Sequence, residues 1–99
     1  MAYQFEFAEA VKPHLAALTA RERTTVLDAI ERQLGHEPLK ESRNRKPLRP
    51  NPIAPWELRV GDLRVFYEVA ATPVSSIHIL AVGIKDGNVV RIGGKEFQL

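Results

Sequence analysis

Residues 56–69 read WELRVGDLRVFYEV, and this stretch decides the fold of the 99-residue chain. Apolar and polar residues alternate on both sides of Gly61 and Asp62, which predicts two antiparallel strands joined by a two-residue turn. In that register Arg59 lies directly opposite Arg64. Both guanidinium groups are then on one face of the hairpin, and the aliphatic residues are on the other.

The opposed arginines are a candidate binding feature. Like charges directly opposite each other on a sheet cost roughly 0.2–1 kcal/mol of stability. Folding gains nothing from such a pair, so Arg59 and Arg64 favour an anionic partner. The alternative is that the two heads spread into solvent or pair with Glu57 and Glu68, which share their face.

The N-terminal residues predict one strand followed by a first helix. Residues 3–7 alternate aromatic and polar side chains, so we expect a strand whose aromatic residues are buried. Val11, Leu15 and Leu18 then follow at helical spacing, which predicts a helix of about three turns. Pro13 fits that helix only in its first turn, where a missing N–H is not needed.

A second helix is predicted from its end signals. Thr19 followed by Glu22 matches a capping box, and Gly35 is a suitable C-terminal stop. The buried stripe of this helix is expected to consist of Val26, Leu27, Ile30 and Leu34.

The segment between this helix and the hairpin is rich in proline and basic residues. Five of the seven prolines fall in residues 38–55, so regular helix or central strand is excluded there. Long connections in small domains are often functional. The basic residues of this segment attract a phosphate backbone or an acidic protein, or form a solvated loop. They are Lys40, Arg43, Arg45, Lys46 and Arg49.

The C-terminal third predicts two more strands. After a turn at residues 70–75, residues 76–84 form a nearly unbroken aliphatic run typical of a central strand buried on both faces. A second turn at residues 86–88 precedes a short strand at 89–92. No structure is assigned after the glycines at 93 and 94.

Together these elements predict an α+β fold of two layers, with an N-terminal strand and a two-helix hairpin packed on an antiparallel β-sheet meander. Ninety-nine residues suffice for one domain, residues 1–99.

Composition excludes several classes of protein. The chain has no cysteine, and hence no disulfide and no thiolate nucleophile or metal ligand. No apolar run is long enough to span a membrane, and the first residues lack the order of a signal peptide, which predicts a cytoplasmic protein. The three histidines share no ligand spacing, so we expect no metal and no cofactor. The net charge is +2, with ten Lys/Arg against seven Asp/Glu in residues 35–99.

The hairpin sequence LRVGDLRVFYEV at residues 58–69, followed by ILAVGIK at residues 79–85, resembles the RelE/ParE superfamily of type II toxin–antitoxin toxins. The resemblance covers nearly the whole chain. It implies a basic cleft on the sheet that engages messenger RNA on the ribosome in members of the RelE kind. Members of the ParE kind inhibit DNA gyrase instead, and an antitoxin neutralises both.

The resemblance also implies site residues. Arg64 matches the family's arginine after the hairpin turn, Arg59 matches a basic residue before it, and Lys85 stands where the nucleases have another basic residue. Arginine binds phosphate oxygens well but is a poor proton carrier. A lysine among other cations is a better one, because its charged form is disfavoured there. Lys85 and Lys46 are the candidates.

The sequence departs from the nuclease pattern at three positions. Pro55 and Glu57 stand where the nucleases place lysines, and Arg91 stands where they carry a tyrosine. Phe66 shares the face of the arginines and is a candidate for stacking on bases. The predicted catalytic residues are therefore Arg64, Lys85, Arg59 and Arg91, and the predicted RNA-binding residues are Lys40, Arg43, Arg45, Lys46, Arg49 and Phe66.

These features lead to the hypothesis of a ribosome-dependent mRNA endonuclease that cleaves through the 2′-hydroxyl, inhibits translation and is neutralised by a cognate antitoxin. Its partners are then the antitoxin, the ribosome and mRNA. Two alternatives remain open, because the acid–base residues match less well than the cations. One is a ParE-like inhibitor of DNA gyrase, and the other is a catalytically inert module that binds nucleic acid or antitoxin.

Overall fold

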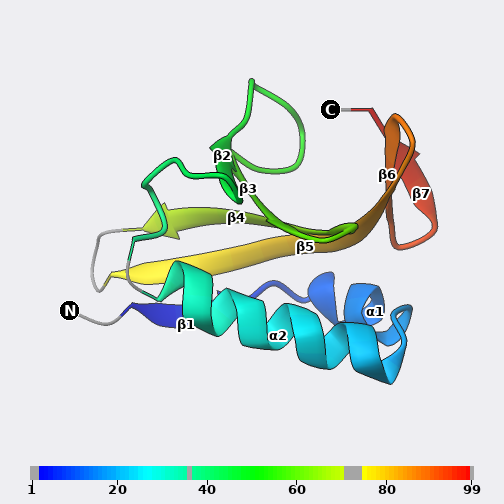
Figure 1. Ribbon diagram of the computed structural model, residues 1–99, viewed down its shortest axis with the longest axis horizontal. Helices are drawn as coiled ribbons and strands as arrows, with labels where there is room; N and C mark the ends of the chain where they lie inside the picture. The colour runs from blue at the N-terminus through cyan, green and yellow to red at the C-terminus, as the bar shows by residue number, and fades with distance from the viewer. Residues whose placement is uncertain (1–2, 36, 71–74, 99) are drawn as a thin grey trace.

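A computed structural model describes residues 3–35, 37–70 and 75–98. Within these residues, two helices lie against one face of a seven-stranded sheet, while the proline-rich segment and the C-terminal strands rise on the other side (Figure 1). The predicted α+β fold of two layers is confirmed.

The elements follow one another as a strand, two helices and six further strands. They are β1 (Gln4–Phe7), α1 (Val11–Ala16), α2 (Ala20–Leu34), β2 (Arg45–Pro47), β3 (Trp56–Val60), β4 (Leu63–Ala70), β5 (Ser76–Asp86), β6 (Val89–Ile92) and β7 (Lys95–Phe97).

The predicted hairpin is formed by β3 and β4 in the expected register. Val60 pairs with Leu63, and Arg59 pairs with Arg64. Gly61 in the turn has a φ of +59°, a left-handed conformation that residues with a side chain rarely adopt. The turn chemistry therefore sets the register that brings the two arginines together.

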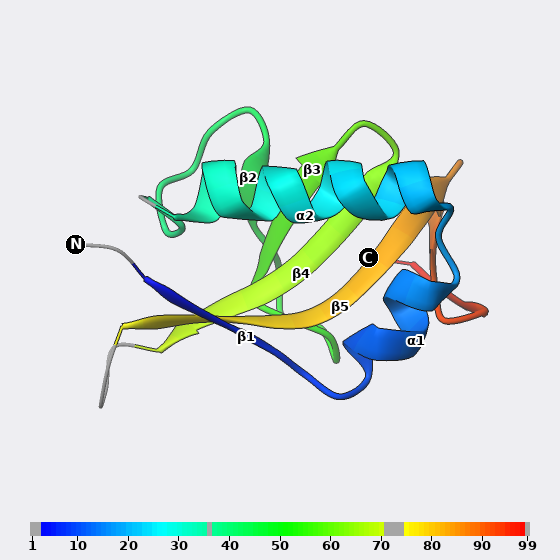
Figure 2. The same ribbon diagram turned by 90° about the horizontal axis from the view of Figure 1, so that it is seen from below.

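The sheet has the order β2-β3-β4-β5-β6-β7 and is antiparallel along this path. The long strand β5 is central, as predicted, and its first half also pairs with β1 (Figure 2). That pairing is parallel, with Phe5 beside Ile77, and was not expected from the sequence. The chain passes through both helices between β1 and the rest of the sheet, which allows the two strands to run in the same direction.

The helices confirm their predicted end signals. Pro13 lies in the first turn of α1, although this helix has six residues and is shorter than expected. At the start of α2, the Thr19 backbone N–H donates to Glu22 Oε1 at 2.9 Å, and the Glu22 N–H donates to Thr19 Oγ1 at 3.1 Å. The helix ends at Gly35, as predicted.

The main core lies between the helices and the sheet. α2 lies across β3 and β4, and α1 lies against β5 (Figure 2). The buried residues of this core come from both layers and are Val11, Leu18, Val26, Ile30, Leu34, Leu58, Leu63, Val65, Tyr67, Ile77, Ile79 and Val82. Trp56, two positions before Leu58 on β3, packs against them.

A second apolar cluster lies on the opposite side of the sheet, which we call the outer face. It contains Ala54, Phe66, Ala81, Val90 and Ile92. Leu48 and Ile53 of the proline-rich segment and Phe97 of β7 pack against it. The outer face is therefore partly covered by segments that the sequence did not assign to the core.

Two apolar residues predicted to be buried are exposed. Leu27 is 40% exposed, because the buried residues of α2 recur every four positions and Leu27 lies about 100° around the helix from Val26. Phe7 is 46% exposed, because it ends a strand that pairs with the sheet on one side only.

The structure of two segments differs from the prediction made from the sequence, and a third predicted segment lies mostly outside the described residues. Residues 45–47 form a short edge strand within the connection expected to be irregular, which is compatible with Pro47 because an edge strand has few obligatory ladder bonds. The glycines at 93 and 94 form a tight turn with positive φ, and residues 95–97 continue as β7. The predicted turn at residues 70–75 lies mostly outside the described residues.

Candidate functional site

The outer-face side of the β3–β4 hairpin carries the two opposed arginines and a buried carboxylate. Glu57 Oε1 lies 2.8 Å from Arg59 Nε and 3.5 Å from Arg64 Nε. The side chains of Glu57 and Arg64 are only 7% and 9% exposed, whereas that of Arg59 is 45% exposed. One carboxylate thus offsets part of the repulsion between the two arginines, so the alternative of local pairing is partly realised.

The head of Arg64 is held by the turn that it follows. Its Nη1 donates to the carbonyl oxygens of Gly61 at 2.6 Å and Leu63 at 2.9 Å. Burial lowers the pKa of Arg64 and neighbouring Arg59 lowers it as well, while Glu57 raises it. Arginine stays protonated in proteins, so this side chain is a fixed positive charge beneath the surface.

Gly83 lies opposite Arg64 on β5 and leaves space at this point of the sheet. A Cβ atom added to Gly83 would lie 2.4 Å from the carbonyl oxygen of Arg91 and 2.7 Å from Ile92 Cγ1. β6 therefore approaches β5 closely here because position 83 has no side chain.

The β5–β6 turn closes the other side of the site. The Lys85 backbone N–H donates to the carbonyl oxygen of Asp62 at 2.7 Å, which ties this part of β5 to the hairpin turn. A hollow of about 190 Å³, which we call the hairpin pocket, results. It is lined by Glu57, Arg59, Arg64, Lys85, Asn88 and Val90.

The hairpin pocket combines three cationic side chains with one carboxylate. Lys85 is exposed, and its ammonium group makes no ion pair within the described part of the chain. Asn88 adds an amide that can both donate and accept. The pocket suits an anionic group that also carries hydrogen-bonding oxygens, such as a phosphate diester.

Two arginines predicted to be functional lie elsewhere. Arg91 pairs in register with Ile84, whereas Lys85 pairs with Val90, so Arg91 and Lys85 project to opposite faces of the sheet. Arg91 contacts two carboxylates, those of Asp86 and Glu96, each at 3.2 Å.

Arg45 fills a structural role at the end of α2. Its Nη1 donates to the carbonyl oxygen of Gln33 at 2.9 Å, and its Nε donates to that of Lys40 at 3.0 Å. A cation that binds carbonyls at a helix C-terminus is favourable. The basic segment is thereby anchored to the helix layer.

The prediction that Phe66 stacks on bases is wrong for this structure. Phe66 is on the outer face, as its parity predicted, but it is fully buried in the second apolar cluster. The proline-rich segment supplies Leu48 and Ile53 to that cluster, and no sequence periodicity indicates such a cover.

The remaining basic residues of the proline-rich segment do not line the hairpin pocket. Lys46 pairs in register with Glu57 on the neighbouring strand, and its Nζ lies 3.8 Å from Glu41 Oε2. Lys40 pairs with Glu37 at 3.5 Å. Arg43 and Arg49 are exposed and have no salt-bridge partner among the described residues.

The histidines lie outside the hairpin pocket. Val82 donates its backbone N–H to His14 Nδ1 at 3.3 Å, which gives this histidine a structural role. His78 lies between Glu6 and Glu68, at 3.3 and 3.4 Å, and does not contribute to the cleft. His36 is not among the described residues. Where side chains are described, no group of three potential metal ligands occurs.

Sequence reasoning missed Asn88 as a pocket residue. It was assigned only to a turn, since nothing in the local pattern indicates that this turn lies beside the hairpin. The pairing of β4 with β5 brings the two turns together.

Comparison with solved structures identifies a protein of the same fold. A chain of the toxin–antitoxin complex RelBE2 from Mycobacterium tuberculosis is 26% identical and has a TM-score of 0.72. The match covers 86% of this chain and 100% of that chain. No protein-family model matches the sequence, and no curated protein matches it.

The fold and this likeness support a RelE-like toxin. The prediction of a RelE/ParE superfamily member, made from the hairpin sequence, is confirmed. No helix in the described part of the chain has the length and apolar character needed to span a bilayer.

Proposed function

We propose that this protein is the toxin of a type II toxin–antitoxin system and that it cleaves messenger RNA on the ribosome. The observation that carries the proposal is the hairpin pocket, where Arg59, Arg64 and Lys85 converge around one buried carboxylate. A single negative charge against three positive ones leaves the pocket cationic. The likeness to a chain of the RelBE2 complex adds independent support.

The chemistry that suits the pocket is cleavage of RNA through its own 2′-hydroxyl. The 2′-oxygen loses a proton and attacks the adjacent phosphorus, and the bond from phosphorus to the 5′-oxygen breaks as that oxygen takes up a proton. The products carry a 2′,3′-cyclic phosphate and a 5′-hydroxyl. Arg59 and Arg64 stabilise the negative charge that develops on the phosphate oxygens.

The proton carriers are then lysines. Lys85 lines the pocket and is the proposed donor to the 5′-oxygen, and Lys46 on β2 is the proposed second carrier. The two lysines belong to strands on opposite sides of the β3–β4 arginine pair. Ribosomal positioning of the RNA supplies much of the remaining barrier reduction.

The proposal includes partners and location. A cognate antitoxin neutralises the toxin, and the ribosome presents the mRNA. Lys40, Arg43 and Arg49 are exposed, and in this proposal they contact the RNA backbone. We further propose that residues 1–99 act as one domain in the cytoplasm.

Substitution of Lys85 tests the proposal directly. Because Lys85 is exposed, Lys85→Ala should leave the free energy of unfolding unchanged. The same substitution should slow cleavage of ribosome-bound mRNA by about 10²-fold or more, because it removes the proposed proton donor. Lys12→Ala, an exposed lysine on α1, is the matched control and should cleave at the rate of the unsubstituted protein. Cleavage is measured by mapping 5′ ends of an mRNA bound to purified ribosomes.

Induction of the protein alone supplies the cellular test. We expect growth arrest together with new 5′ ends in transcripts, and no arrest with Arg64→Ala. Because Arg64 is buried, circular dichroism must show that this variant is folded. Growth arrest with intact transcripts would rule out cleavage.

A ParE-like inhibitor of DNA gyrase is a second candidate. The observation that favours it is the weak acid–base set of the hairpin pocket, in which Lys85 and Glu57 are the only side chains suited to carry a proton among the described lining residues. A supercoiling assay distinguishes the two functions, since a nuclease of the RelE kind leaves gyrase activity unchanged. An inert binding module would affect neither mRNA nor gyrase.

A further inference from the structure

A pocket of about 390 Å³ opens at the edge of the sheet, away from the hairpin pocket. β1 pairs with β5 as far as Ile79, and β6 pairs with it from Ile84, so residues 80–83 have no paired strand on this side among the described residues. α1 lies beside this gap and next to the turn between β6 and β7 (Figure 2). The volume falls in the range of roughly 300–1,000 Å³ typical of ligand sites. We call this hollow the edge pocket.

The lining of the edge pocket is apolar apart from two side chains. These are His14 of α1 and Lys95 of β7, and no acidic residue is among the described residues that line the pocket. An apolar cavity with a few polar groups at fixed places is typical of sites for small molecules. The other lining residues are Ala10, Pro13, Pro52, Ile53, Leu80, Ala81, Ile92, Gly93 and Phe97.

The hydrogen bond that His14 makes determines which ring nitrogen it offers to a ligand. Val82 donates its backbone N–H to Nδ1, so the neutral imidazole carries its proton on Nε2. Burial lowers the pKa of His14, which favours the neutral ring. Nε2 lies at the turn between β6 and β7, where a Cβ atom added to Gly93 would be 3.2 Å from it. It has no hydrogen-bond acceptor within the described chain, and so presents a free N–H donor at the pocket wall.

Lys95 brings a positive charge to the same turn. It pairs with Ile92 across the two glycines, so both side chains project to one face, which Phe97 shares. Ile92 and Phe97 belong to the apolar cluster of the outer face. Lys95 is exposed and forms no ion pair with any described residue. The ammonium group and the His14 N–H therefore flank the same turn without an anion between them.

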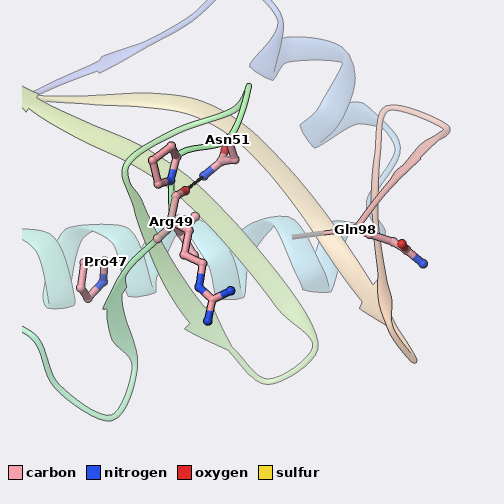
Figure 3. Close-up of a pocket in the computed structure, with 6 residues that line it drawn as sticks. Pro47, Arg49, Asn51 and Gln98 are labelled. Carbon is pink, nitrogen blue, oxygen red and sulfur yellow. Dashed lines mark hydrogen bonds between the residues drawn. The ribbon is translucent and has the colours of Figure 1, made fainter.

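One apolar wall of the pocket is held in shape by Asn51. Its side-chain amide donates to the carbonyl oxygens of Arg49 at 2.7 Å (Figure 3) and Ala54 at 2.9 Å. Its Oδ1 accepts from the backbone N–H groups of Ile53 and Ala54 at 2.8 and 3.0 Å. Pro52 and Ile53, which line the pocket, are thereby fixed before a ligand arrives, and this lowers the cost of binding.

We propose that the edge pocket binds a small monocarboxylic acid with an apolar body, whose carboxylate accepts from His14 Nε2–H and pairs with Lys95. Hydrogen bonds to a carboxylate are stronger than those to a neutral acceptor, so these two donors orient the ligand. The apolar body is removed from water against side chains such as Ile53 and Leu80. The edge pocket shares no lining residue with the hairpin pocket, and the inference does not depend on RNA cleavage.

Titration of the full ¹⁵N-labelled chain tests the ligand chemistry, with octanoate as the aliphatic acid and 3-phenylpropionate as the aromatic one. We expect saturable shifts of the backbone amides of Leu80, Val82 and Gly93 with at least one acid. 1-Octanol has the chain without the charge and should bind at least about fivefold more weakly than octanoate if octanoate is the ligand, and acetate should not saturate. No saturable shift with either acid below the concentration at which it aggregates, or shifts confined to other segments, would overturn the inference.

The position of the carboxylate is tested with two variants that each remove one positive charge. Lys95→Gln should weaken binding of the better acid by about fivefold, whereas Arg21→Gln, on the exposed surface of α2, should leave it unchanged. Long-range ¹H–¹⁵N spectra of the imidazole should show His14 protonated on Nε2, with a resonance that moves during the titration. Equal affinity of Lys95→Gln and the unsubstituted protein, or an unmoved Nε2 resonance, would refute the assigned carboxylate position.

Discussion

Glu57 shows how one residue makes a costly arrangement of charges tolerable. Its carboxylate is buried between Arg59 and Arg64 at the point where the hairpin register opposes two like charges. The resemblance to the nucleases of the RelE/ParE superfamily implies a cation at this position. A carboxylate at this position reduces the positive charge of the pocket and at the same time holds the two arginines in place.

Glu57→Gln should lower the free energy of unfolding by about 2 kcal/mol, because buried Arg64 loses its counterion. Urea titration measures the effect. Glu96→Gln is the matched control, since Glu96 pairs with Arg91 at the surface and its loss should cost less than about 0.5 kcal/mol. Equal losses in the two variants would show that Glu57 is not a buried counterion.

His14 makes stability depend on pH. Burial lowers the pKa of His14 below its ordinary value of 6.5, and its Nδ1 must be unprotonated to accept the hydrogen bond from Val82. The unfolded chain therefore binds more protons than the native state just below pH 6.5, and stability decreases as the pH falls through that range.

His14→Gln should reduce this loss of stability between pH 7.5 and pH 5, because glutamine still offers an acceptor but does not titrate. Urea titrations of both proteins at several pH values provide the comparison. If the two proteins lose stability in parallel, the effect belongs to other groups.

At the scale of elements, the termini of α2 and the edges of the sheet are defined by local chemistry. The capping box starts α2 after a separate short helix, so the two helices can meet the sheet in different directions. Pro47 in β2 has no N–H, and the Arg45 carbonyl accepts from the Ser42 N–H. This edge is therefore poorly suited to pair with a further strand.

Thr19→Ala should destabilise the protein by about 1 kcal/mol, because the backbone N–H of Glu22 loses its acceptor. Thermal unfolding followed by circular dichroism reports the change. Thr25→Ala on the exposed side of the same helix is the control and should leave stability unchanged or slightly raised. A loss that is equal at both positions would argue against the cap.

At the scale of the whole molecule, Tyr67 connects the sheet to the segment that follows α2. Its side chain is fully buried, its ring stacks on Trp56 with centroids 6.2 Å apart, and its hydroxyl donates to the carbonyl oxygen of Pro38 at 2.5 Å. Burial raises the pKa of Tyr67, although nearby Arg45 lowers it in part. The basic segment is thereby fixed at its start before it crosses to the outer face.

Tyr67→Phe should cost about 1–3 kcal/mol, because the buried Pro38 carbonyl is left without a donor. Tyr3→Phe is the control, since the Tyr3 hydroxyl makes no hydrogen bond to the described residues. The midpoint of urea unfolding of each variant is compared with that of the unsubstituted protein. A loss no larger than that of the control would mean that Tyr67 contributes through packing alone.

The order of the longer elements (β1, α1, α2 and β3 to β6), the hairpin register and the start and end of α2 could be predicted from the chain, because they follow from near-neighbour rules of periodicity, turn geometry and capping; the short strands β2 and β7 could not. The opposed arginines belong to this group, since a two-residue turn determines which residues face each other. The predictions that Leu27 and Phe7 are buried were wrong. Both residues fit the period of an apolar face, but the part of that face covered by other segments is too narrow to include them.

The composition of the site depended on contacts between segments distant in the chain. Phe66 and Arg91 are residue types common in nucleic-acid sites, but neither lies in the hairpin pocket. Residues of the proline-rich segment cover Phe66 and bury it. The register of β5 with β6 places Arg91 on the face of the sheet opposite Lys85. Asn88 carries no local signal and reaches its place because the pairing of β4 with β5 brings its turn beside the hairpin turn. Long-range pairing and the packing of irregular segments arise from the balance of many weak contacts, which no short stretch of sequence encodes.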